Sequence, residues 1–445
     1  MSDDISPGHE TRQVVRELLG AMTEGREVRA WLKQFTQLER QRFAIIKIGG
    51  GTLRDEMPTI CSALSFLQKL GLSPVIVHGG GPQIDDALRQ AGIETPRIDG
   101  LRVTSPAAMP VIASALREVS LGFVSALNAK GANAVFCPAE TVQATLIEPE
   151  KLGRVGTPSR IDFDAIAQIT QNGQLPILSS VAMADDGQEA NINADALVRE
   201  LAIGLQPQKI IFLTPTGAIL DADGGRISAI HLLKDYETII AEPWLLGGMK
   251  LKLQQINDML EQLPLTTSAA ITSPDQLVKE LFTHGGSGTL IRKGEKTPVI
   301  CQQEQLDEPA LRGLIETAFG RTLLAEYWQN LDFAFAIASS SNRALALVTR
   351  QRGHLYLDKF AVSEQARGEG LGAAVWKVLL AQAPVLFWRS RISNPVNPFY
   401  FAEADGSAKS GDWRIFWCGQ IDWADLPTQI EHIANLDDTF VETAP

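Results

Sequence analysis

Residues 43–51 read Phe43-Ala-Ile-Ile-Lys-Ile-Gly-Gly-Gly51, and residues 74–81 read Pro74-Val-Ile-Val-His-Gly-Gly-Gly81. Each stretch is a short apolar run that ends in three glycines, and a helical pattern follows each of them, over 57–70 and 82–91. Similar apolar runs return further along the chain, at 176–179, 209–214 and 268–272. Continuous apolar strands that alternate with helices predict an α/β domain with a mostly parallel sheet, covered by helices on both faces.

The last third of the chain has a different pattern. Apolar stretches follow one another there without helices between them, at Phe333–Ala338, Ala344–Thr349 and His354–Val362. Consecutive strands predict an antiparallel sheet and an α+β second domain. Turn-forming and charged residues collect between the two patterns, so we place a linker there. The predicted parts are a helical N-terminal arm, a first domain, this linker and a second domain, at 1–40, 41–293, 294–308 and 309–445.

The composition argues against several classes of function. A net charge of −12 over 445 residues repels polyphosphate backbones, so we expect no nucleic-acid partner. The four cysteines are far apart, which argues against a disulfide framework or a metal site and suits a reducing compartment. The acidic N-terminus does not read as a signal peptide, and no apolar run reaches about 18 residues. We therefore expect a cytoplasmic protein without a membrane partner.

The two glycine turns indicate an anion site. Both fall where strands of a parallel sheet end, and their free N–H groups can bind phosphate or carboxylate oxygens. Lys47 interrupts an apolar strand just before the first turn, which is uncommon unless the side chain points at an anion. Lys250 and Lys252 open a predicted helix and cannot share one face, so one of them can reach the site. The alternative is a pair of structural turns with solvated lysines.

Two further polar groups belong to this candidate site. Asn191 and Asp195 are four residues apart at the start of a predicted helix and could share a face. The alternative is that Asn191 or Asn193 caps that helix. Arg102, in the stretch Asp99-Gly-Leu-Arg-Val-Thr104, can fork a carboxylate with two N–H groups, or it is an ordinary surface arginine.

Together these motifs resemble the N-acetylglutamate kinases of the amino-acid kinase fold, a three-layer sandwich. The resemblance covers residues 41–293 through Ile46-Lys-Ile-Gly-Gly50, Val77-His-Gly-Gly-Gly-Pro82, Gly100–Thr104, Asn191–Asp195 and Gly248-Met-Lys-Leu-Lys252. It implies that Lys47 and Lys252 stabilise the transferred phosphoryl group and that Asp195 orients both lysines. By the same match Gly49 and Gly50 bind the nucleotide, and Gly79 and Gly80 bind the reacting carboxylate. Arg102 and Asn191 bind the acetylated amino acid.

This chemistry suits the residues present. A γ-carboxylate is already ionised at neutral pH and needs no general base. The catalyst has to align two anions and neutralise charge on the phosphoryl oxygens, which lysines and N–H groups can do. Mg²⁺ would arrive with ATP, and we predict no metal site in the protein itself.

A second candidate site begins at Gln365. The stretch Phe360-Ala-Val-Ser-Glu-Gln-Ala-Arg-Gly-Glu-Gly-Leu-Gly372 ends a strand, opens a helix and can wrap a pyrophosphate. It resembles the coenzyme A loop of the GNAT acyltransferases, and the alternative is a structural turn. The resemblance implies an acetyl-CoA site formed by Val362, Gln365, Arg367, Gly368, Gly370 and Gly372.

Downstream, Leu386-Phe-Trp-Arg-Ser-Arg-Ile-Ser-Asn-Pro-Val-Asn-Pro-Phe-Tyr-Phe401 resembles the C-terminal domain of vertebrate-like N-acetylglutamate synthases. The resemblance covers about 300–445 and implies glutamate contacts at Lys359, Arg389 and Asn394. The alternatives are a surface ion pair for Arg389 and a turn before Pro395 for Asn394. Acetyl transfer needs an acid for the departing thiolate and a base for the ammonium proton. Our candidate acid is Tyr400, and the alternative is that Tyr400 is only a packed aromatic. Our candidate base is Asp358, acting through water.

The order of the domains resembles the fused N-acetylglutamate synthase/kinases of some bacteria. That implies acetylation of L-glutamate by acetyl-CoA and phosphorylation of N-acetyl-L-glutamate by ATP, at the start of arginine biosynthesis. The stretch Lys279-Glu-Leu-Phe-Thr-His-Gly-Gly-Ser-Gly-Thr289 resembles the arginine-binding segment of arginine-sensitive kinases, which points to Glu280 and Gly286. In this family the N-terminal arm and domain contacts build homo-oligomers, commonly tetramers.

Two other functions fit parts of the sequence. One is a synthase whose kinase-like domain only senses arginine, but a sensor needs no phosphoryl-transfer lysine such as Lys47 or Lys252. The other is a metabolite-binding regulator without catalysis, against which the coenzyme loop, Arg389 and Tyr400 argue.

Overall fold

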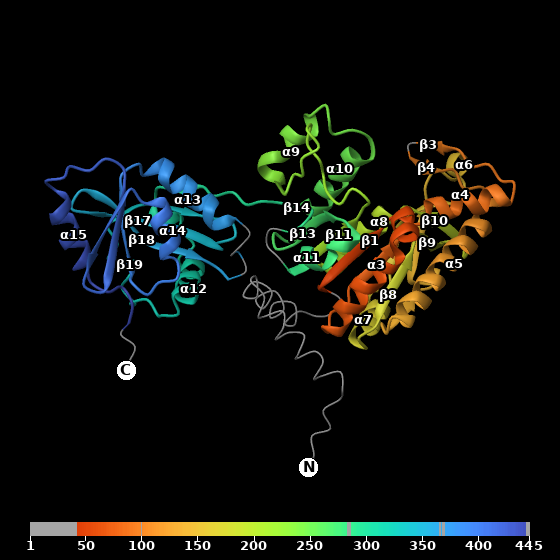
Figure 1. Ribbon diagram of the computed structural model, residues 1–445, viewed down its shortest axis with the longest axis horizontal. Coiled ribbons are helices and arrows are strands. Elements are labelled where there is room, and N and C mark those ends of the chain that lie inside the picture. The colour runs from red at the N-terminus through yellow and green to blue at the C-terminus, as the bar shows by residue number, and fades with distance from the viewer. Residues whose placement is uncertain (1–41, 99, 283–285, 365, 367–369, 442–445) are drawn as a thin grey trace, which may run out of the picture. The chain divides into compact units, whose positions relative to one another are not determined.

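The computed structural model describes residues 42–441 except 99, 283–285, 365 and 367–369 (Figure 1). The helical arm predicted over 1–40 lies outside these described residues. The chain forms two compact units, residues 1–294 and 295–445, and each is described by itself.

The first unit contains an eight-stranded sheet with the order β12-β14-β13-β11-β1-β2-β8-β5. The six strands from β13 to β5 run parallel to their neighbours, and β14 is antiparallel to β13. The α/β prediction is therefore confirmed. The strands are β1 (Ala44–Ile48), β2 (Val75–His78), β5 (Ala134–Phe136), β8 (Leu175–Ser179), β11 (Lys209–Leu213), β12 (Ala229–His231), β13 (Ser268–Thr272) and β14 (Thr289–Arg292).

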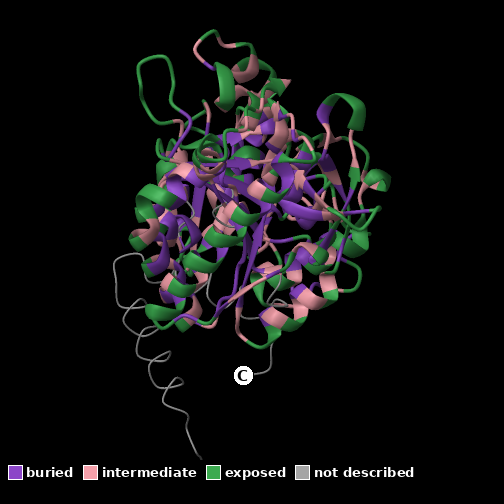
Figure 2. Cartoon of the chain, turned by 90° about the vertical axis from the view of Figure 1, so that its right-hand side faces the viewer, coloured by how far each residue is buried: buried purple, intermediate pink, exposed green. Residues whose placement is uncertain are grey.

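Both faces of this sheet are buried, which explains the continuous apolar strands. Successive side chains of a strand point to opposite faces, and Ile45 and Ile46 accordingly join two different hydrophobic clusters. Figure 2 shows the buried residues concentrated along the strands and the exposed residues on the covering helices and loops. Each fully buried isoleucine stabilises the fold by about 1.5–3 kcal/mol.

Helix α3 (Gly50–Lys69) begins directly after β1, so the predicted start at residue 57 was wrong. The helix is broken at Glu56, whose φ of −121° and ψ of 20° are not helical, two residues before Pro58. A proline removes one helical N–H and restricts the residue before it. The regular apolar spacing is therefore visible in the sequence only after this break. Helix α4 (Gly81–Gln90) lies within one residue of its predicted range.

A small closed barrel of four strands was not predicted. It is formed by β6 (Val142–Leu146), β7 (Val155–Ile161), β9 (Val181–Ala184) and β10 (Glu189–Ile192), and a hairpin of β3 (Arg97–Ile98) and β4 (Leu101–Arg102) precedes it in the chain. Asn191 lies on β10, so the idea that it shares a helical face with Asp195 was wrong. Asn193 caps α8 (Ala194–Leu205) and accepts the N–H of Asp195 at 2.7 Å.

The other helices of the first unit cover the sheet and flank the barrel. Among the described helices, α5 alone is long and apolar enough by length and composition to cross a membrane. It packs Ile112, Leu116 and Phe123 into the unit. These helices are α5 (Ala108–Ala129), α6 (Pro149–Leu152), α7 (Phe163–Gln171), α9 (Leu232–Ala241), α10 (Gly247–Glu261) and α11 (Leu277–Phe282).

The second unit is a seven-stranded sheet with the order β15-β16-β17-β18-β19-β21-β20. All neighbouring strands are antiparallel except β18 and β19, which run parallel. The strands are β15 (Val299–Ile300), β16 (Phe333–Ala338), β17 (Ala344–Gln351), β18 (His354–Val362), β19 (Leu386–Arg391), β20 (Gly406–Ser410) and β21 (Trp413–Cys418). The helices are α12 (Glu308–Phe319), α13 (Leu371–Gln382), α14 (Asn397–Glu403) and α15 (Leu426–Ala434).

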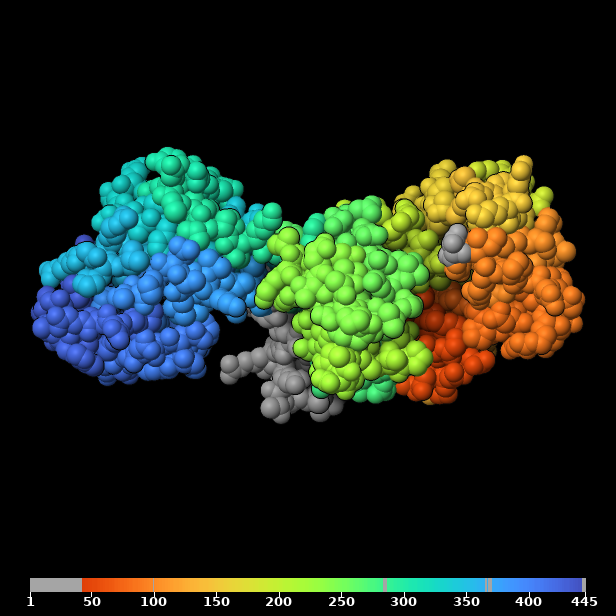
Figure 3. Space-filling model, turned by 90° about the horizontal axis from the view of Figure 1, so that it is seen from above, coloured from red at the N-terminus to blue at the C-terminus, as the bar shows by residue number. Residues whose placement is uncertain are grey.

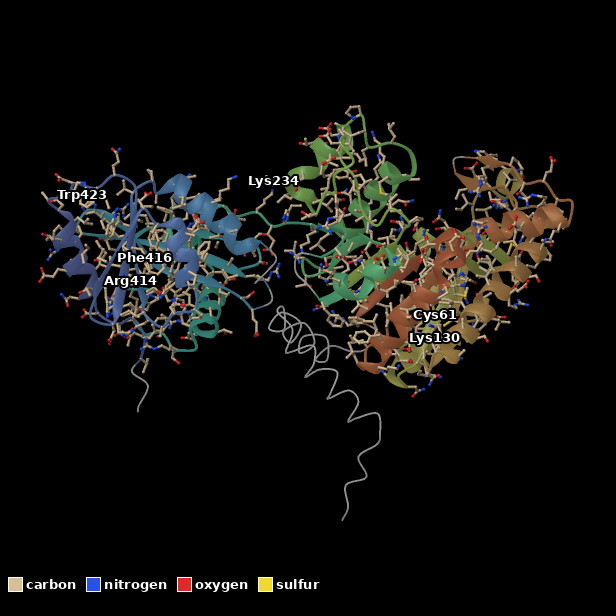
Figure 4. All side chains as sticks on the ribbon, in the orientation of Figure 1. Cys61, Lys130, Lys234, Arg414, Phe416 and Trp423 are labelled. Carbon is tan, nitrogen blue, oxygen red and sulfur yellow. The ribbon has the colours of Figure 1, made fainter. Side chains whose placement is uncertain are left out.

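Aromatic side chains fill the core of the second unit. Trp388 and Phe416 are buried and stack with ring centroids 5.5 Å apart. Figure 4 shows Phe416 inside this unit and Trp423 at its surface, where Trp423 is 80% exposed. Cys61, Cys137 and Cys418 are buried and Cys301 is exposed, and all four thiols are free.

Candidate active sites

The first site is built where the parallel strands end. Lys47, near the end of β1, has its Nζ 3.0 Å from Oδ1 of Asp195 in the first turn of α8. Lys252 reaches the same place from α10, where its Nζ lies 5.0 Å from the centroid of the Phe212 ring. Three elements far apart in sequence therefore bring two ammonium groups and one carboxylate together.

The electrostatics of this cluster follow from burial and mutual charge. Burial alone would raise the pKa of Asp195, but Lys47 and Lys252 hold that pKa below its ordinary value. Burial lowers the pKa of Lys252, and the Asp195 carboxylate opposes this effect. The Asp195 carboxylate is therefore ionised at neutral pH and compensates the positive charge of the two lysines.

The two glycine turns pack against each other beside this cluster. A Cβ on Gly50 would lie 2.7 Å from Gly80 Cα, so no side chain fits there, and a Cβ on Gly80 would lie 2.5 Å from Cδ2 of Leu116, which would have to move. Gln83 donates its Nε2 hydrogen to the carbonyl of Gly50 at 2.9 Å, which ties the start of α4 to the start of α3. Two helix N-termini with small residues thus face one place, an arrangement that favours anions.

A hollow separates two lobes of the first unit. Figure 3 shows the segment around β1 and α3, in red, between a lobe formed around residues 215–260, in green, and a lobe formed around residues 80–150, in orange and yellow.

Arg102 and Asn191 are joined through Thr104. Asn191 donates its Nδ2 hydrogen to Thr104 Oγ1 at 3.1 Å, and the Thr104 hydroxyl donates to the carbonyl of Arg102 at 3.0 Å. The Arg102 guanidinium is buried and bonds to the carboxylate of Asp85 and to Thr95 Oγ1. Asp85 stands on α4, which begins at the second glycine turn, so this guanidinium already holds a carboxylate close to the predicted substrate site.

Glu280 and Gly286, predicted to bind arginine, lie together. The buried Glu280 accepts the N–H groups of Ser287 and Gly288 at 2.7 and 3.0 Å. Gly286 has a φ of +59°, and a Cβ there would lie 2.7 Å from Oε2 of Glu280. Residues 283–285 of this segment lie outside the described part of the chain.

The second site begins where β18 leaves β19. The two strands pair only at Tyr356–Phe387 and Leu357–Trp388, and Asp358 is the extra residue of a bulge against β17. Beyond the bulge, the edge of β18 that faces β19 pairs with no strand in the described part of the chain. Its backbone N–H and C=O groups can bind an extended ligand there.

Helix α13 begins beside this open edge. Gly370 caps the helix with a φ of +79°, and a Cβ on Gly372 would lie 3.1 Å from Cγ2 of Val362. The open strand edge and a helix N-terminus therefore meet at Val362, as an acyl carrier with a pyrophosphate requires. Gln365, Arg367 and Gly368 of the predicted loop lie outside the described residues.

Asp358 is held between a phenol and an ammonium group. Its Oδ2 lies 2.7 Å from Nζ of the buried Lys359, and it also accepts the hydroxyl of Tyr327. Burial and the Asp358 charge raise the pKa of Tyr327 well above its ordinary value, so this phenol stays protonated and donates. The rings of Tyr327 and Phe440 lie 4.9 and 5.3 Å from the same Nζ.

Arg389 and Asn394, predicted to contact glutamate, make bonds within the protein. Arg389 donates to the carbonyls of Ile433, Leu436 and Asp437 at 3.0, 2.7 and 3.0 Å, at the end of α15. Asn394 donates to Ser390 Oγ at 2.8 Å and accepts the N–H of Val396 at 3.0 Å. Arg389 therefore caps a helix rather than forming a surface ion pair, and Asn394 stabilises the turn around Pro395.

Tyr400 lies on α14 in an aromatic cluster. Its ring centroid is 5.7 Å from those of Trp376 and Phe416 and 5.9 Å from that of Trp388. Burial raises the pKa of Tyr400, which keeps its hydroxyl protonated at neutral pH. No described residue forms a hydrogen bond to this hydroxyl, so its proton is available to a ligand.

Several residues at these sites escaped the sequence analysis. His78 stands inside the second glycine motif, but the sequence assigned it no role. Ser120, Thr104 and Tyr327 carry ordinary hydroxyls without a motif, and only the fold brings them to His78, Asn191 and Asp358. The signal available for His78 was its place at the end of an apolar strand, where a buried polar group needs partners.

Comparisons with known proteins agree with both units. Residues 42–266 match the amino acid kinase family, and residues 300–437 match the N-acetyltransferase of N-acetylglutamate synthase. An acetylglutamate kinase of Xanthomonas campestris pv. campestris is 42% identical over 94% of this chain and its own full length, and one of Xylella fastidiosa is 42% identical over 95% and its full length. The human mitochondrial N-acetylglutamate synthase is 29% identical over 94% of this chain and 77% of its own.

A solved structure shows the same fold in both units. The N-acetylglutamate synthase of Neisseria gonorrhoeae covers 88% of this chain and 97% of its own, with a TM-score of 0.61 and 18% identity. The kinase match spans half of the chain, and the Xanthomonas and Xylella relatives carry the likeness through the second unit as well. This chain therefore belongs to the amino acid kinase family, in the arginine-biosynthesis branch whose kinase domain is fused to the N-acetyltransferase domain of N-acetylglutamate synthase.

Proposed function

We propose that this chain is a bifunctional enzyme that acetylates L-glutamate with acetyl-CoA and phosphorylates the γ-carboxylate of N-acetyl-L-glutamate with ATP and Mg²⁺. The observation that carries the kinase half is the cluster of Lys47, Asp195 and Lys252 beside two helix N-termini. A domain that only sensed arginine would gain nothing from two lysines gathered around one carboxylate. The likeness to acetylglutamate kinases over their whole length supports the same assignment.

Phosphoryl transfer depends here on position and charge. The γ-carboxylate attacks as an anion, so the protein has to offset repulsion between two anions and hold them in line. Lys47 and Lys252 supply positive charge from two directions, and the Asp195 carboxylate attracts both and offsets their mutual repulsion. Free N–H groups of the glycine turns bind the carboxylate and phosphate oxygens, while Arg102 and Asn191 hold the rest of the substrate.

Acetyl transfer uses the open edge of β18. Acetyl-CoA fits beside Val362, where a strand edge without a partner meets the N-terminus of α13. The Tyr400 hydroxyl is protonated and gives its hydrogen to the departing thiolate. Asp358 takes the ammonium proton of glutamate through water, and Lys359 next to it balances its charge.

The regulator follows from the same family. One structure of the Neisseria synthase holds coenzyme A and L-arginine, and another holds coenzyme A and N-acetyl-glutamate. We propose that L-arginine regulates this chain at the segment of Glu280 and Gly286, and that the protein works as a cytoplasmic homo-oligomer, a tetramer. An arginine-sensing synthase without kinase activity remains the second candidate, because Glu280 and Gly286 are placed together.

A single-vessel reaction tests the proposal. The purified chain is incubated with glutamate, acetyl-CoA, ATP, Mg²⁺ and hydroxylamine, which traps an acyl phosphate as a hydroxamate that mass spectrometry identifies. We expect the N-acetylglutamyl hydroxamate, and we expect none when acetyl-CoA is omitted. Formation of N-acetylglutamate without the hydroxamate would support the synthase activity and refute the kinase activity.

A further inference from the structure

His78 is a buried polar side chain behind the second glycine turn, and the reaction described above does not use it. It ends β2, is 0% exposed, and its two ring nitrogens both have partners. Nδ1 lies 3.0 Å from the carbonyl oxygen of Gly79, and Nε2 lies 2.8 Å from Oγ of Ser120 on α5.

The partners determine which nitrogen carries the hydrogen. A carbonyl oxygen only accepts, so Nδ1 must donate to Gly79, and in a neutral ring Nε2 then accepts from the Ser120 hydroxyl. Burial lowers the pKa of His78 to about 4, which keeps the ring neutral at physiological pH. The carbonyl of Leu116, 2.8 Å from the same hydroxyl, is its competing acceptor.

The bond to Gly79 fixes the orientation of one peptide group. The C=O of Gly79 and the N–H of Gly80 belong to the same planar trans peptide and point in opposite directions. Because the carbonyl points at an imidazole in the core, the N–H of Gly80 points away from the core. The N–H of Gly79 donates to the carbonyl of Ile48 at 3.0 Å, so of these two glycines only Gly80 has a free N–H among the described residues.

The packing around the turn allows this peptide little freedom except rotation. Leu116 of α5 lies against Gly80 on one side, and Gly50 lies against it on the other. Two glycines in sequence have low barriers to such a rotation. A rotated peptide would present the Gly79 carbonyl, a negative dipole, to an incoming anion in place of the Gly80 N–H.

We propose that His78, whose Nε2 contacts Ser120, is a positioning residue that holds the Gly79–Gly80 peptide with the Gly80 N–H ready to bind the reacting carboxylate. The inference rests on the proposed kinase function and adds to it a preset oxyanion donor. Loss of one such donor reduces turnover by about 10²–10³-fold in enzymes that depend on it. We expect a smaller loss for its positioning residue, because the rotated state remains in equilibrium with the correct one.

Four variants test this role. His78→Leu removes the donor, whereas His78→Asn keeps an N–H near the place of Nδ1. Ser120→Ala removes the hydroxyl that contacts Nε2 of His78, and Ser120→Thr keeps a hydroxyl there. The readouts are kcat and KM of ADP release with N-acetylglutamate, together with the far-UV circular dichroism of each variant and its acetyl transfer as a control in the same chain.

We expect His78→Leu to lower kcat by about 10–100-fold, with KM for ATP and acetyl transfer within about twofold of the wild type. His78→Asn should recover most of the loss, a rescue that a purely structural role would not give. If His78→Leu does not fold, Ser120→Ala decides, with an expected fall in kcat of about three- to tenfold and recovery in Ser120→Thr.

A folded His78→Leu with unchanged kcat, or a His78→Asn no better than His78→Leu, overturns the inference alone. If His78→Leu does not fold, an unchanged kcat in Ser120→Ala overturns the inference as well. A wild-type chain that releases no ADP overturns the proposed function and this inference with it.

Discussion

Nζ of Lys47 lies 3.0 Å from Oδ1 of Asp195, although about half of the first unit lies between β1 and α8 in the sequence. The contact is partly shielded from water, because the Lys47 side chain is only 14% exposed. With Lys252 beside them, the three groups carry one net positive charge before any substrate binds. An anion that reaches this cluster therefore meets a preformed site.

Removing the charge of Asp195 should impair phosphoryl transfer. In Asp195→Asn the two lysines repel each other without a carboxylate between them, and we expect kcat of ADP release to fall by about 10²-fold or more. The exposed Asp185→Asn makes the same change of charge outside the cluster and should leave kcat within about twofold. Equal kinetics for the two variants would show that the cluster has no part in catalysis.

His78 should make the stability of the first unit depend on pH. Its pKa is lowered from 6.5 to about 4, so between these values the unfolded chain binds a proton that the native chain does not. The free energy of unfolding should therefore fall as the pH is lowered, by about 2 kcal/mol between roughly pH 7 and pH 5. Stability above about pH 6.5 should not change through this group.

The measurement is urea unfolding read by pulsed hydrogen exchange in peptides of β2 and α5. His78→Asn has no ring to titrate, so the difference between wild type and variant isolates this one group. If the difference in the free energy of unfolding between wild type and His78→Asn is constant over this pH range, the His78 ring does not cause the pH dependence.

Arg389 should stabilise the second unit by holding the end of α15. Arg389→Ala leaves several carbonyls without a donor, and we expect the free energy of unfolding to fall by about 2 kcal/mol. Arg391 is the matched control, because both guanidinium groups lie about equally close to the Trp413 ring, at 4.2 and 4.0 Å. Arg391 is 46% exposed, and its substitution should cost less than about 1 kcal/mol.

Tryptophan fluorescence during urea unfolding follows this unit, which contains Trp388 in its core. The glutamate KM of acetyl transfer is measured on the same two variants. A stable Arg389→Ala with a strongly raised KM would assign Arg389 to substrate binding alone, as the family resemblance implies, and would refute the structural role.

The strands could be read from the sequence where burial is complete on both faces. Ser268–Thr272 is buried along its whole length and has the predicted bounds, because such a strand is a continuous apolar run between polar turns. The barrel strand Glu189–Ile192 alternates polar and apolar residues, but it escaped because four residues are too few to distinguish a strand period from chance. The start of α3 escaped because two glycines and Pro58 hide its helical spacing.

Some site residues could likewise be predicted from the sequence, and others could not. Lys47 was conspicuous because a charged side chain interrupts an apolar strand. Arg389 donates to carbonyls more than 40 positions away, and Ser120, which contacts Nε2 of His78, is 42 positions from it, so no local pattern encodes these contacts. Asp358 was a candidate base in the sequence, and only the bulge in β18 and the hydroxyl of Tyr327 show how it is held.

The most direct test of the central claim is a pair of assays on one preparation, ADP release with N-acetylglutamate and thiol release from acetyl-CoA with glutamate. They are run on the wild type, Lys252→Ala and Tyr400→Phe. The bifunctional assignment predicts both activities in the wild type, with a loss of about 10²-fold in ADP release alone for Lys252→Ala and in thiol release alone for Tyr400→Phe. Thiol release without any ADP release in the wild type would contradict it and leave the first unit as an arginine sensor.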